Sequence, residues 1–279
     1  MQIIPKVALA KYCSLGVGGK ADFFGELKNL AELPAILEFA KGFPLFWLGG
    51  GSNVFFADEG FRGLVIQNGL KGLFQEKDFF TVNSGEALGN LVRILTEQNL
   101  AGGEQLAGIP GTVGGAVAGN ANEIGQFLVS AKIVKTGSRS LQREVWLPMQ
   151  CQFRYRFSAL RNSGNFLLSA KFCFPPARKR VDLAQQVKRK QAKQPFRGTS
   201  GSWFKNPPGQ KAWRLIAAVG GRGLQVGQAR VSPLHANFFE NLGGAWASDF
   251  LSLEKRVQER VWQRFRVQLE REVIFVAAC

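Results

Sequence analysis

Apolar residues recur along this chain with two spacings, one typical of amphipathic helices and one typical of short buried strands. The first third and the last third show both patterns in alternation, separated by clusters of Gly, Pro and Ser. This pattern predicts helices over residues 30–39, 88–100, 213–219 and 247–265. It predicts strands over residues 44–48, 64–66, 79–82, 166–174, 235–239 and 273–276.

The order of these elements predicts an α+β fold of two linked lobes followed by a C-terminal domain. Pro175-Pro176 and the basic stretch behind them mark a boundary. The chain has 279 residues, of which 46% are hydrophobic, so a sizeable core is expected rather than disorder. Its 33 glycines cluster in loops, which favours specialised turns over a fibrous repeat.

Membrane, secretory and metal-binding classes find little support in the sequence. The longest charge-free stretch, residues 105–122, holds Pro110 and five glycines, which makes it a poor spanning helix. Residues 1–11 lack the apolar core of a signal peptide. The four cysteines are far apart and His235 is the only histidine, so neither a disulfide framework nor a metal site is expected. The expected location is the cytoplasm.

The net charge of +16 leaves two interpretations open. The densest basic block runs from Arg178 to Arg197 and could bind nucleic acid. Leu183 and Val187 stand four apart in it, which favours the other interpretation, a helix with a solvated basic face. The block contains a single aromatic residue, Phe196, whereas base stacking calls for more.

Two glycine-rich stretches are candidates for a nucleotide cofactor. Gly49-Gly50-Gly51-Ser52-Asn53 follows a predicted strand, and its backbone N–H groups could converge on a phosphate. A Gly-rich hairpin turn is the alternative, and Val54 breaks the dinucleotide fingerprint. Gly108–Gly119 forms two predicted turns of small, uncharged residues, which suit the ring and diphosphate of a flavin.

Four polar residues could carry chemistry, each with a structural alternative. Ser202 could donate a proton, although serines after glycine more often cap or turn. Arg156 stands among aromatic residues, where it would bind an anion or form an internal ion pair. Glu272 follows Arg271, which favours a solvated charge cluster. His235 lies in an apolar context more typical of a structural histidine than of a base.

Taken together, six motifs in order resemble the UDP-N-acetylenolpyruvoylglucosamine reductase family from Ser14 to Val276. They are Ser14–Asp22, Gly49–Asn53, Gly108–Gly115, Tyr155–Ser158, Gly201–Pro208 and Val231–Asn241. The resemblance implies a two-lobed FAD-binding region of p-cresol methylhydroxylase type and a C-terminal substrate-binding domain. It further implies lobes over residues 1–70 and 71–178, a substrate domain over 179–279, and the short subclass that lacks a substrate-covering Tyr loop.

The function implied is NADPH-dependent reduction of UDP-N-acetylglucosamine enolpyruvate to UDP-N-acetylmuramate through noncovalent FAD, in peptidoglycan precursor synthesis. In this resemblance Arg156 polarises the substrate carboxylate, Ser202 protonates the substrate carbon, and Glu272 is the family's acid near the C-terminus. Tyr155, Lys205 and Asn206 are expected to contact substrate. The expected FAD contacts are Gly49, Gly50, Gly51, Ser52, Asn53, Gly108, Ile109, Pro110, Gly111, Thr112, Gly114, Gly115 and Ala116.

The expected partners are the UDP-sugar and NADPH, with no nucleic acid, no membrane span and a monomeric protein. Two alternatives stay open at this point: a basic nucleic-acid-binding protein and a flavin oxidase of the same fold. The chain departs from the family pattern at Asn122 and Ile124, where Gly and an aromatic residue are usual. It also departs at Gly198-Thr199-Ser200 and at Ala277-Ala278-Cys279.

Overall fold

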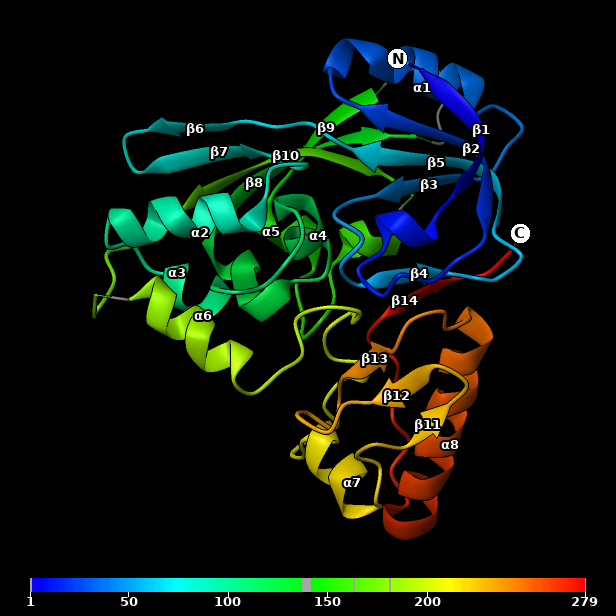
Figure 1. Cartoon of the computed structure of the whole chain (residues 1–279). Helices are drawn as coiled ribbons and strands as arrows, with labels where there is room; N and C mark the ends of the chain where they lie inside the picture. Colours follow the sequence, from blue (N-terminus) through cyan, green and yellow to red (C-terminus); the bar gives the residue numbers. More distant parts are fainter. Residues whose placement is uncertain (1, 137–141, 163, 181, 279) are drawn as a thin grey trace. The chain divides into compact units, whose positions relative to one another are not determined.

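A computed structural model describes residues 2–136, 142–162, 164–180 and 182–278 (Figure 1). The chain divides into two compact units, each built from segments that are distant in the sequence. Unit 1 comprises Met1–Ile3, Gly25–Gly50 and Val65–Arg189, and unit 2 comprises Ile4–Phe24, Gly51–Leu64 and Lys190–Cys279. The sequence-based division at residues 70 and 178 stays a prediction.

The N-terminal part of the chain forms a four-stranded sheet in the order β1-β2-β5-β3. Its strands are β1 (Ile3–Ala8), β2 (Lys20–Leu27), β5 (Phe61–Asn68) and β3 (Leu45–Leu48). The division between the units passes through β2 and β5. Short helices interrupt this region: η1 (Ala10–Tyr12), η2 (Leu30–Glu32) and α1 (Leu33–Phe39). Asn29 and Glu32 form a capping box at the start of η2.

A five-stranded antiparallel sheet with the order β6-β7-β10-β8-β9 organises the rest of unit 1. The strands are β6 (Leu73–Glu76), β7 (Phe79–Asn83), β10 (Phe166–Cys173), β8 (Leu128–Lys135) and β9 (Gln142–Trp146). Register shifts interrupt the β10–β8 pairing between Leu167 and Ser169 and between Lys171 and Phe172. The connecting helices are α2 (Leu88–Glu97), α3 (Gly103–Leu106), α4 (Val113–Ala118), η3 (Ala121–Phe127), α5 (Pro148–Cys151) and η4 (Ala159–Asn162), and α6 (Leu183–Gln191) follows the sheet.

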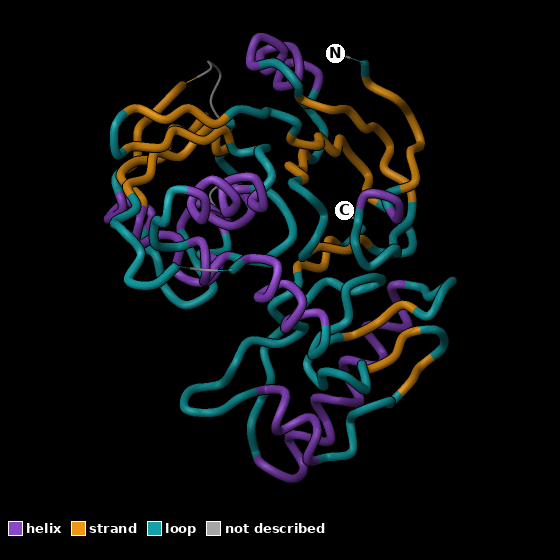
Figure 2. The backbone as a smooth tube through the Cα atoms, turned by 60° about the vertical axis from the view of Figure 1, so that its left-hand side comes forward, coloured by secondary structure: helices purple, strands orange, loops and turns teal. Residues whose placement is uncertain are grey.

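Helices α2, α3 and α4 lie on one face of this sheet (Figures 1 and 2). Alternating residues of β7 and β10 point toward them and form a hydrophobic core with Leu91 and Leu95 of α2 and Val117 of α4. This packing fixes α4 against β7 and β10. The sheet therefore provides a rigid base for the Gly-rich segment that α4 belongs to.

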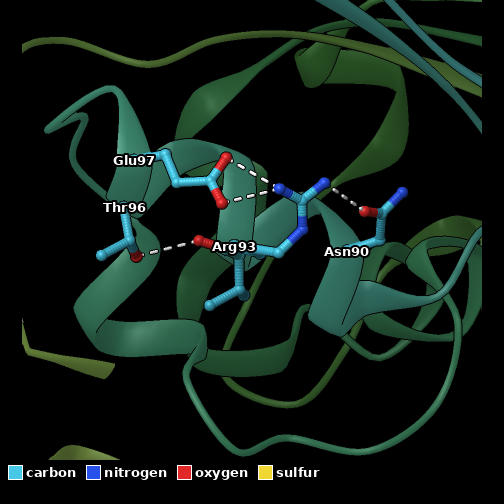
Figure 3. Close-up of polar contacts among 5 residues, drawn as sticks. Asn90, Arg93, Thr96 and Glu97 are labelled. Carbon is cyan, nitrogen blue, oxygen red and sulfur yellow. Dashed lines mark hydrogen bonds and ion pairs between the residues drawn. The ribbon is translucent and has the colours of Figure 1, made fainter. Parts of the chain in front are cut away.

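The exposed face of α2 is held by side-chain contacts one helical turn apart (Figure 3). Arg93 donates to both carboxylate oxygens of Glu97 at 2.7 Å and to Asn90 Oδ1 at 3.1 Å. Thr96 Oγ1 donates back to the carbonyl of Val92 at 2.9 Å. The Arg93–Glu97 pair is exposed, so it contributes only about 0.3–0.5 kcal/mol to helix stability.

Unit 2 is built around the long helix α8 (Ala247–Phe265). Its other elements are α7 (Ala212–Ala218), the sheet of β11 (Gln225–Val226), β12 (Ala229–Val231) and β13 (Phe239–Asn241), and the parallel pair β14 (Ile274–Val276) and β4 (Val54–Phe56). The core is aromatic: Trp203 stacks on Phe239 and Phe250 at centroid distances of 4.5 and 5.4 Å.

Most of the elements predicted from apolar spacing are present, including α8 with the predicted bounds. Two predictions were wrong in part. Residues 235–238 form no strand, because Ser232 Oγ accepts from the amides of Leu234 and His235, and Phe238 N donates to His235 O. These bonds close a turn, and β13 begins only at Phe239. The second correction is that Gly108–Gly119 contains a helix, α4, where two turns were expected.

Candidate active site

The two glycine-rich segments approach one another through their backbones. A Cβ atom on Gly50 would lie 2.9 Å from the Cα of Gly111, and a Cβ on Gly49 would lie 2.9 Å from Thr112 Oγ1. Both distances are too short for a real side chain, so glycine is required here for the two segments to pack. Gly49 and Gly50 of the first segment are therefore neighbours of Gly111 and Thr112 of the second within unit 1.

Thr112 begins helix α4, and its Oγ1 accepts from the amide of Gly115 at 3.3 Å. Gly114 donates to Ser84 O at 2.8 Å, and a Cβ on Gly114 would meet Ser84 atoms at 2.8 and 2.9 Å. Gly115 differs, since its nearest neighbour for a Cβ is Thr112 Oγ1 at an ordinary 3.6 Å. Gly115 thus leaves open space beside the first turn of α4, which fits a planar or phosphate-bearing cofactor.

These contacts change the explanation for two of the glycines. Gly50 and Gly114 are among the expected FAD contacts, where a side chain would be expected to collide with the cofactor. In the structure, side chains at both positions would first collide with the protein, at Gly111 and at Ser84. Of these three glycines, only Gly115 leaves room that the protein itself does not fill.

The other predicted cofactor contacts divide between the units. Gly108, Ile109, Pro110 and Ala116 belong to unit 1, where Ile109 packs on the core and Ala116 is buried. Gly51, Ser52 and Asn53 belong to unit 2. Asn53 O accepts from the amide of Ile274 at 3.0 Å, and its Nδ2 donates to Glu272 O at 3.4 Å. Asn53 and Glu272 are therefore brought together.

Arg156 lies in a tight turn that is closed by its neighbours. Arg154 N donates to Phe157 O at 3.0 Å, and Phe157 N donates to Arg154 O at 3.1 Å, which leaves Tyr155 and Arg156 at the tip. Arg156 has φ 54°, a left-handed conformation that turns usually assign to Gly or Asn. Tyr155 is 53% exposed, and the Arg156 guanidinium lies 6.0 Å from its ring centroid.

A groove of about 520 Å³ borders this turn. Its walls include Tyr155 and Arg154 of the turn, Asn120 and Glu123 of the preceding loop, and Met149 of α5. The half-buried Arg156 side chain and the exposed Tyr155 ring form a cationic and aromatic edge in unit 1.

Ser202 belongs to a segment held on both sides within unit 2. Trp203 N donates to Asn237 O at 2.7 Å. The Asn237 side chain forms two bonds with the backbone of Phe204: its Oδ1 accepts from Phe204 N at 3.0 Å, and its Nδ2 donates to Phe204 O at 2.8 Å. On the other side, Trp203 O accepts from the amide of Glu272 at 2.8 Å. The backbone thus places Ser202 and Glu272 on neighbouring segments.

A buried carboxylate of α8 fixes the same two segments. Glu254 is 5% exposed, and its Oε2 accepts from Trp203 Nε1 at 2.9 Å and from Arg271 Nε at 2.6 Å. Trp203 is adjacent to Ser202, and Arg271 is adjacent to Glu272. Glu272 itself is 8% exposed, so the prediction of a solvated charge cluster was wrong for this residue.

Lys205 and Asn206, which follow in the same segment, have structural contacts. Lys205 Nζ lies 3.1 Å from Glu270 Oε2, and its amide donates to Glu270 O. Asn206 Oδ1 accepts from Ala212 N at 3.0 Å and so holds the first turn of α7. Their expected role in substrate binding stays a prediction.

Burial shifts the pKa of two cysteines and of His235, which lie outside these segments. Burial raises the pKa of the Cys13 thiol to about 12 and that of Cys151 to about 11, which makes both thiols inert. Burial, together with nearby Arg222, lowers the pKa of His235. Among the described residues, no cluster of His, Cys, Asp or Glu could hold a metal, and no helix could cross a membrane. Cys279 lies outside the described residues.

Comparison with known proteins identifies the family to which this chain belongs. Residues 21–133 match the FAD binding domain, and residues 191–276 match the C-terminal domain of UDP-N-acetylenolpyruvoylglucosamine reductase. A reductase of that name from Geobacter sulfurreducens is 37% identical, with 98% of this chain and 93% of the relative covered. One from Rubrobacter xylanophilus is 38% identical over 95% of this chain and 92% of the relative.

The chain belongs to the UDP-N-acetylenolpyruvoylglucosamine reductase family. The crystal structure of the reductase from Thermus caldophilus superposes with a TM-score of 0.82 at 33% identity and covers 99% of both chains. The resemblance, the fold class and the assignment as an FAD-dependent oxidoreductase are thereby confirmed. Assignment to the short subclass stays a prediction.

The structure places the expected reductase residues in two groups. Arg156, Tyr155 and the segment around Gly115 lie in unit 1, whereas Ser202 and Glu272 lie in unit 2. The sequence pattern gave no role to Asn120, Ser158 or Glu254. Asn120 and Ser158 bond to the carbonyls of Arg154 and Ala118, and Glu254 bonds to the side chains of Trp203 and Arg271. Ser158 stands in a family motif and could have been noticed. An isolated Asn120 or Glu254 gives no signal of its own in the sequence.

Proposed function

We propose that this reductase converts UDP-N-acetylglucosamine enolpyruvate to UDP-N-acetylmuramate with NADPH as the reductant. When bound, FAD would supply the chemistry of hydride transfer between NADPH and the terminal carbon of the enolpyruvyl group. The Gly49–Asn53 and Gly108–Ala116 segments would hold it. The open space at Gly115 supports that placement.

Three residues would complete the reaction at the substrate. Arg156 would bind the enolpyruvyl carboxylate and stabilise the negative charge that develops toward it. Glu272, in its protonated form, would donate a hydrogen bond to the same charge. Ser202 would then deliver a proton to the neighbouring carbon, a task for which a serine must be held firmly in position.

The observation that carries this proposal is the similarity over nearly the whole chain. Arg156 and Ser202 stand in the motifs that resemble the family's, and Glu272 matches its acid near the C-terminus. The support from geometry is local. Glu272 is buried, and hydrogen bonds hold its segment against that of Ser202. The turn that holds Arg156 borders a groove, which its neighbours Arg154 and Tyr155 line. Tyr155, Lys205 and Asn206 would add contacts to the UDP-sugar.

Anaerobic stopped-flow absorption tests this function directly. NADPH should bleach the flavin bands of the purified protein, and the enolpyruvyl substrate should restore them with formation of UDP-N-acetylmuramate. A flavin that stays reduced with this substrate would refute the function. Rapid reoxidation by oxygen in place of the substrate would identify an oxidase of the same fold.

The proposal includes two further expectations. The enzyme would act as a monomer, because each chain would contain all three reacting side chains. It would act in the cytoplasm, where UDP-sugars and NADPH are available. Light scattering of the purified protein and fractionation of cells test the two expectations separately.

A further inference from the structure

One carbonyl oxygen closes the turn that presents Arg156 and also anchors it. Arg154 O accepts from Phe157 N at 3.1 Å, which completes the turn. The same oxygen accepts from Asn120 Nδ2 at 2.9 Å. Both lone pairs of Arg154 O are therefore used, one within the turn and one by a residue 34 positions away in the sequence.

The other end of the Asn120 amide is fixed as well. Its Oδ1 accepts from Gly125 N at 3.0 Å, and the side chain is only 7% exposed. Asn120 has φ 45° and ψ 49°, the left-handed conformation that Asn adopts more readily than most residues. The side chain is thus a rigid bridge between the η3 loop and the Arg154–Phe157 turn.

This bridge starts directly behind α4, the helix that contains Gly115. Asn120 N donates to Val117 O of α4 at 3.1 Å. A second link runs parallel to it, because the fully buried Ser158 donates through Oγ to Ala118 O at 2.8 Å. The turn is therefore tied to the end of the proposed cofactor helix on both sides of Arg156.

The turn needs such support because Arg156 disfavours its own backbone conformation. A φ of 54° is energetically unfavourable for arginine, whereas glycine adopts it without cost. The hydrogen bonds around the turn must supply the order that the residue type does not. Loss of the bridge would allow the guanidinium to move even where the protein stays folded.

We propose that Asn120 is a positioning residue that sets Arg156 for the enolpyruvyl carboxylate through the carbonyl of Arg154. This inference rests on the proposed function, because it assumes that Arg156 binds the reacting carboxylate. Asn120 acts through the turn, because both ends of its side-chain amide are bonded within the protein. It couples the placement of the carboxylate to the placement of α4.

The chain offers a matched control for this residue. Asn122 also has a left-handed backbone, with φ 44° and ψ 41°, and its Nδ2 donates to the backbone oxygen of Gln105 at 2.6 Å. Asn122 is exposed, and its hydrogen bond leads away from the turn. N122G therefore removes a bond of the same kind from the same loop, in a backbone that glycine accepts.

The experiment compares wild type, N120D, N120G and N122G as purified flavoproteins. N120D keeps an acceptor for Gly125 N but has no donor for Arg154 O, whereas N120G removes both bonds. We expect kcat for enolpyruvyl reduction to fall about tenfold to a hundredfold in both Asn120 variants, as for a misplaced reacting group. In both Asn120 variants the flavin content, the rate of the NADPH half-reaction and the calorimetric Kd for the substrate should equal the values for N122G.

A double-mutant cycle distinguishes positioning from general damage. In an R156K background, N120D should cause little further loss, because the group that it positions has already been replaced. Fully multiplicative losses would overturn the proposal, as would equal kcat in N120D and N122G. Failure of both Asn120 variants to fold with flavin would also overturn it. If the function itself is wrong, wild type already fails to reduce the enolpyruvyl substrate.

Discussion

The amide of Glu272 donates to the carbonyl of Trp203 at 2.8 Å, so the segment that contains the buried acid is bonded to the segment that contains Ser202. The bond is between backbone groups, and Glu254 reinforces it by accepting from both Trp203 and Arg271. Side chains at position 202 can therefore be exchanged with little effect on this framework.

The Ser202→Ala variant should keep its fold and its flavin, and it should be reduced by NADPH at nearly the wild-type rate. Reoxidation by the enolpyruvyl substrate should slow by about 10²–10⁴-fold, the usual contribution of a positioned acid. Rapid-mixing absorption measures the two half-reactions separately. If both rates fall equally, Ser202 has a structural role only.

Ser200 provides the control for that variant. Its buried Oγ has no hydrogen-bond partner within the described part of the chain, and the residue is 4% exposed. Replacing an unsatisfied buried hydroxyl by a hydrogen atom is close to neutral or stabilising. Ser200→Ala should therefore leave both half-reactions unchanged and the melting temperature equal or higher.

Arg156→Lys keeps the positive charge and the strained backbone but loses the planar pair of donors that matches a carboxylate. We expect kcat to fall about 10²-fold, while the substrate Kd changes modestly. Steady-state kinetics with calorimetric binding checks this. Arg154→Lys is the control, because the exposed Arg154 side chain lies over the Phe157 ring at 5.6 Å. Equal effects of the two substitutions would contradict the role given to Arg156.

Gly115→Val should yield folded protein without flavin colour. A Cβ at Gly115 meets only Thr112 Oγ1 at 3.6 Å, so the added side chain would occupy space that the protein leaves for the cofactor. Gly89→Val is matched, since Gly89 is an exposed helical glycine of α2 whose Cβ would meet nothing within 4 Å. Absorption at the flavin bands per protein, with circular dichroism for the fold, separates the two. Full flavin occupancy in G115V would refute this placement.

Periodicity predicted the long elements well because burial of one face determines them. In α8 the apolar residues Phe250, Leu253, Val257 and Val261 recur every three or four positions, and all are buried. Local hydrogen bonds determine the bounds of the short elements instead. The His235 segment has a strand-like composition, yet Ser232 Oγ turns the chain there. A three-residue strand such as β13 gives too little pattern to locate its start.

The sequence alone proposes a candidate site where chemistry and motif coincide, as at Arg156, Ser202 and Gly115, and these roles stay predictions. Its supporting residues were not predictable, because their partners are distant in sequence: Asn120 bonds to Arg154, and Glu254 bonds to Trp203. The sequence context also misjudged Glu272, which follows the charged residues Glu270 and Arg271 and is nonetheless buried. Its burial depends on the Trp203 pairing, and one sequence does not reveal that pairing.

Asp58 should stabilise unit 2 by capping α8 from outside the helix. Its Oδ1 accepts from Ala247 N at 2.6 Å and its Oδ2 from Ser248 N at 3.0 Å, where the helix dipole favours a negative charge. Asp58→Ala should cost about 1 kcal/mol of unfolding free energy. That loss corresponds to about 2–4 °C in melting temperature. The melting temperature of Asp58→Asn should lie between those of wild type and Asp58→Ala. An Asp58→Ala variant as stable as wild type would refute the cap.

The stability of the folded protein should depend on pH through His235, the only histidine. Burial and Arg222 lower the pKa of His235 in the folded protein, and its Nδ1 accepts from Asn237 N at 3.3 Å, which requires the neutral ring. The unfolded chain binds a proton near the ordinary pKa of about 6.5. As pH falls from there toward the lower folded pKa, the unfolded state therefore binds more protons and the folded state loses stability. Differential scanning calorimetry of wild type and His235→Gln between pH 7.5 and 5.5 tests this. Wild type should lose more stability than the variant over that range, and parallel curves would show that His235 contributes nothing to the pH dependence.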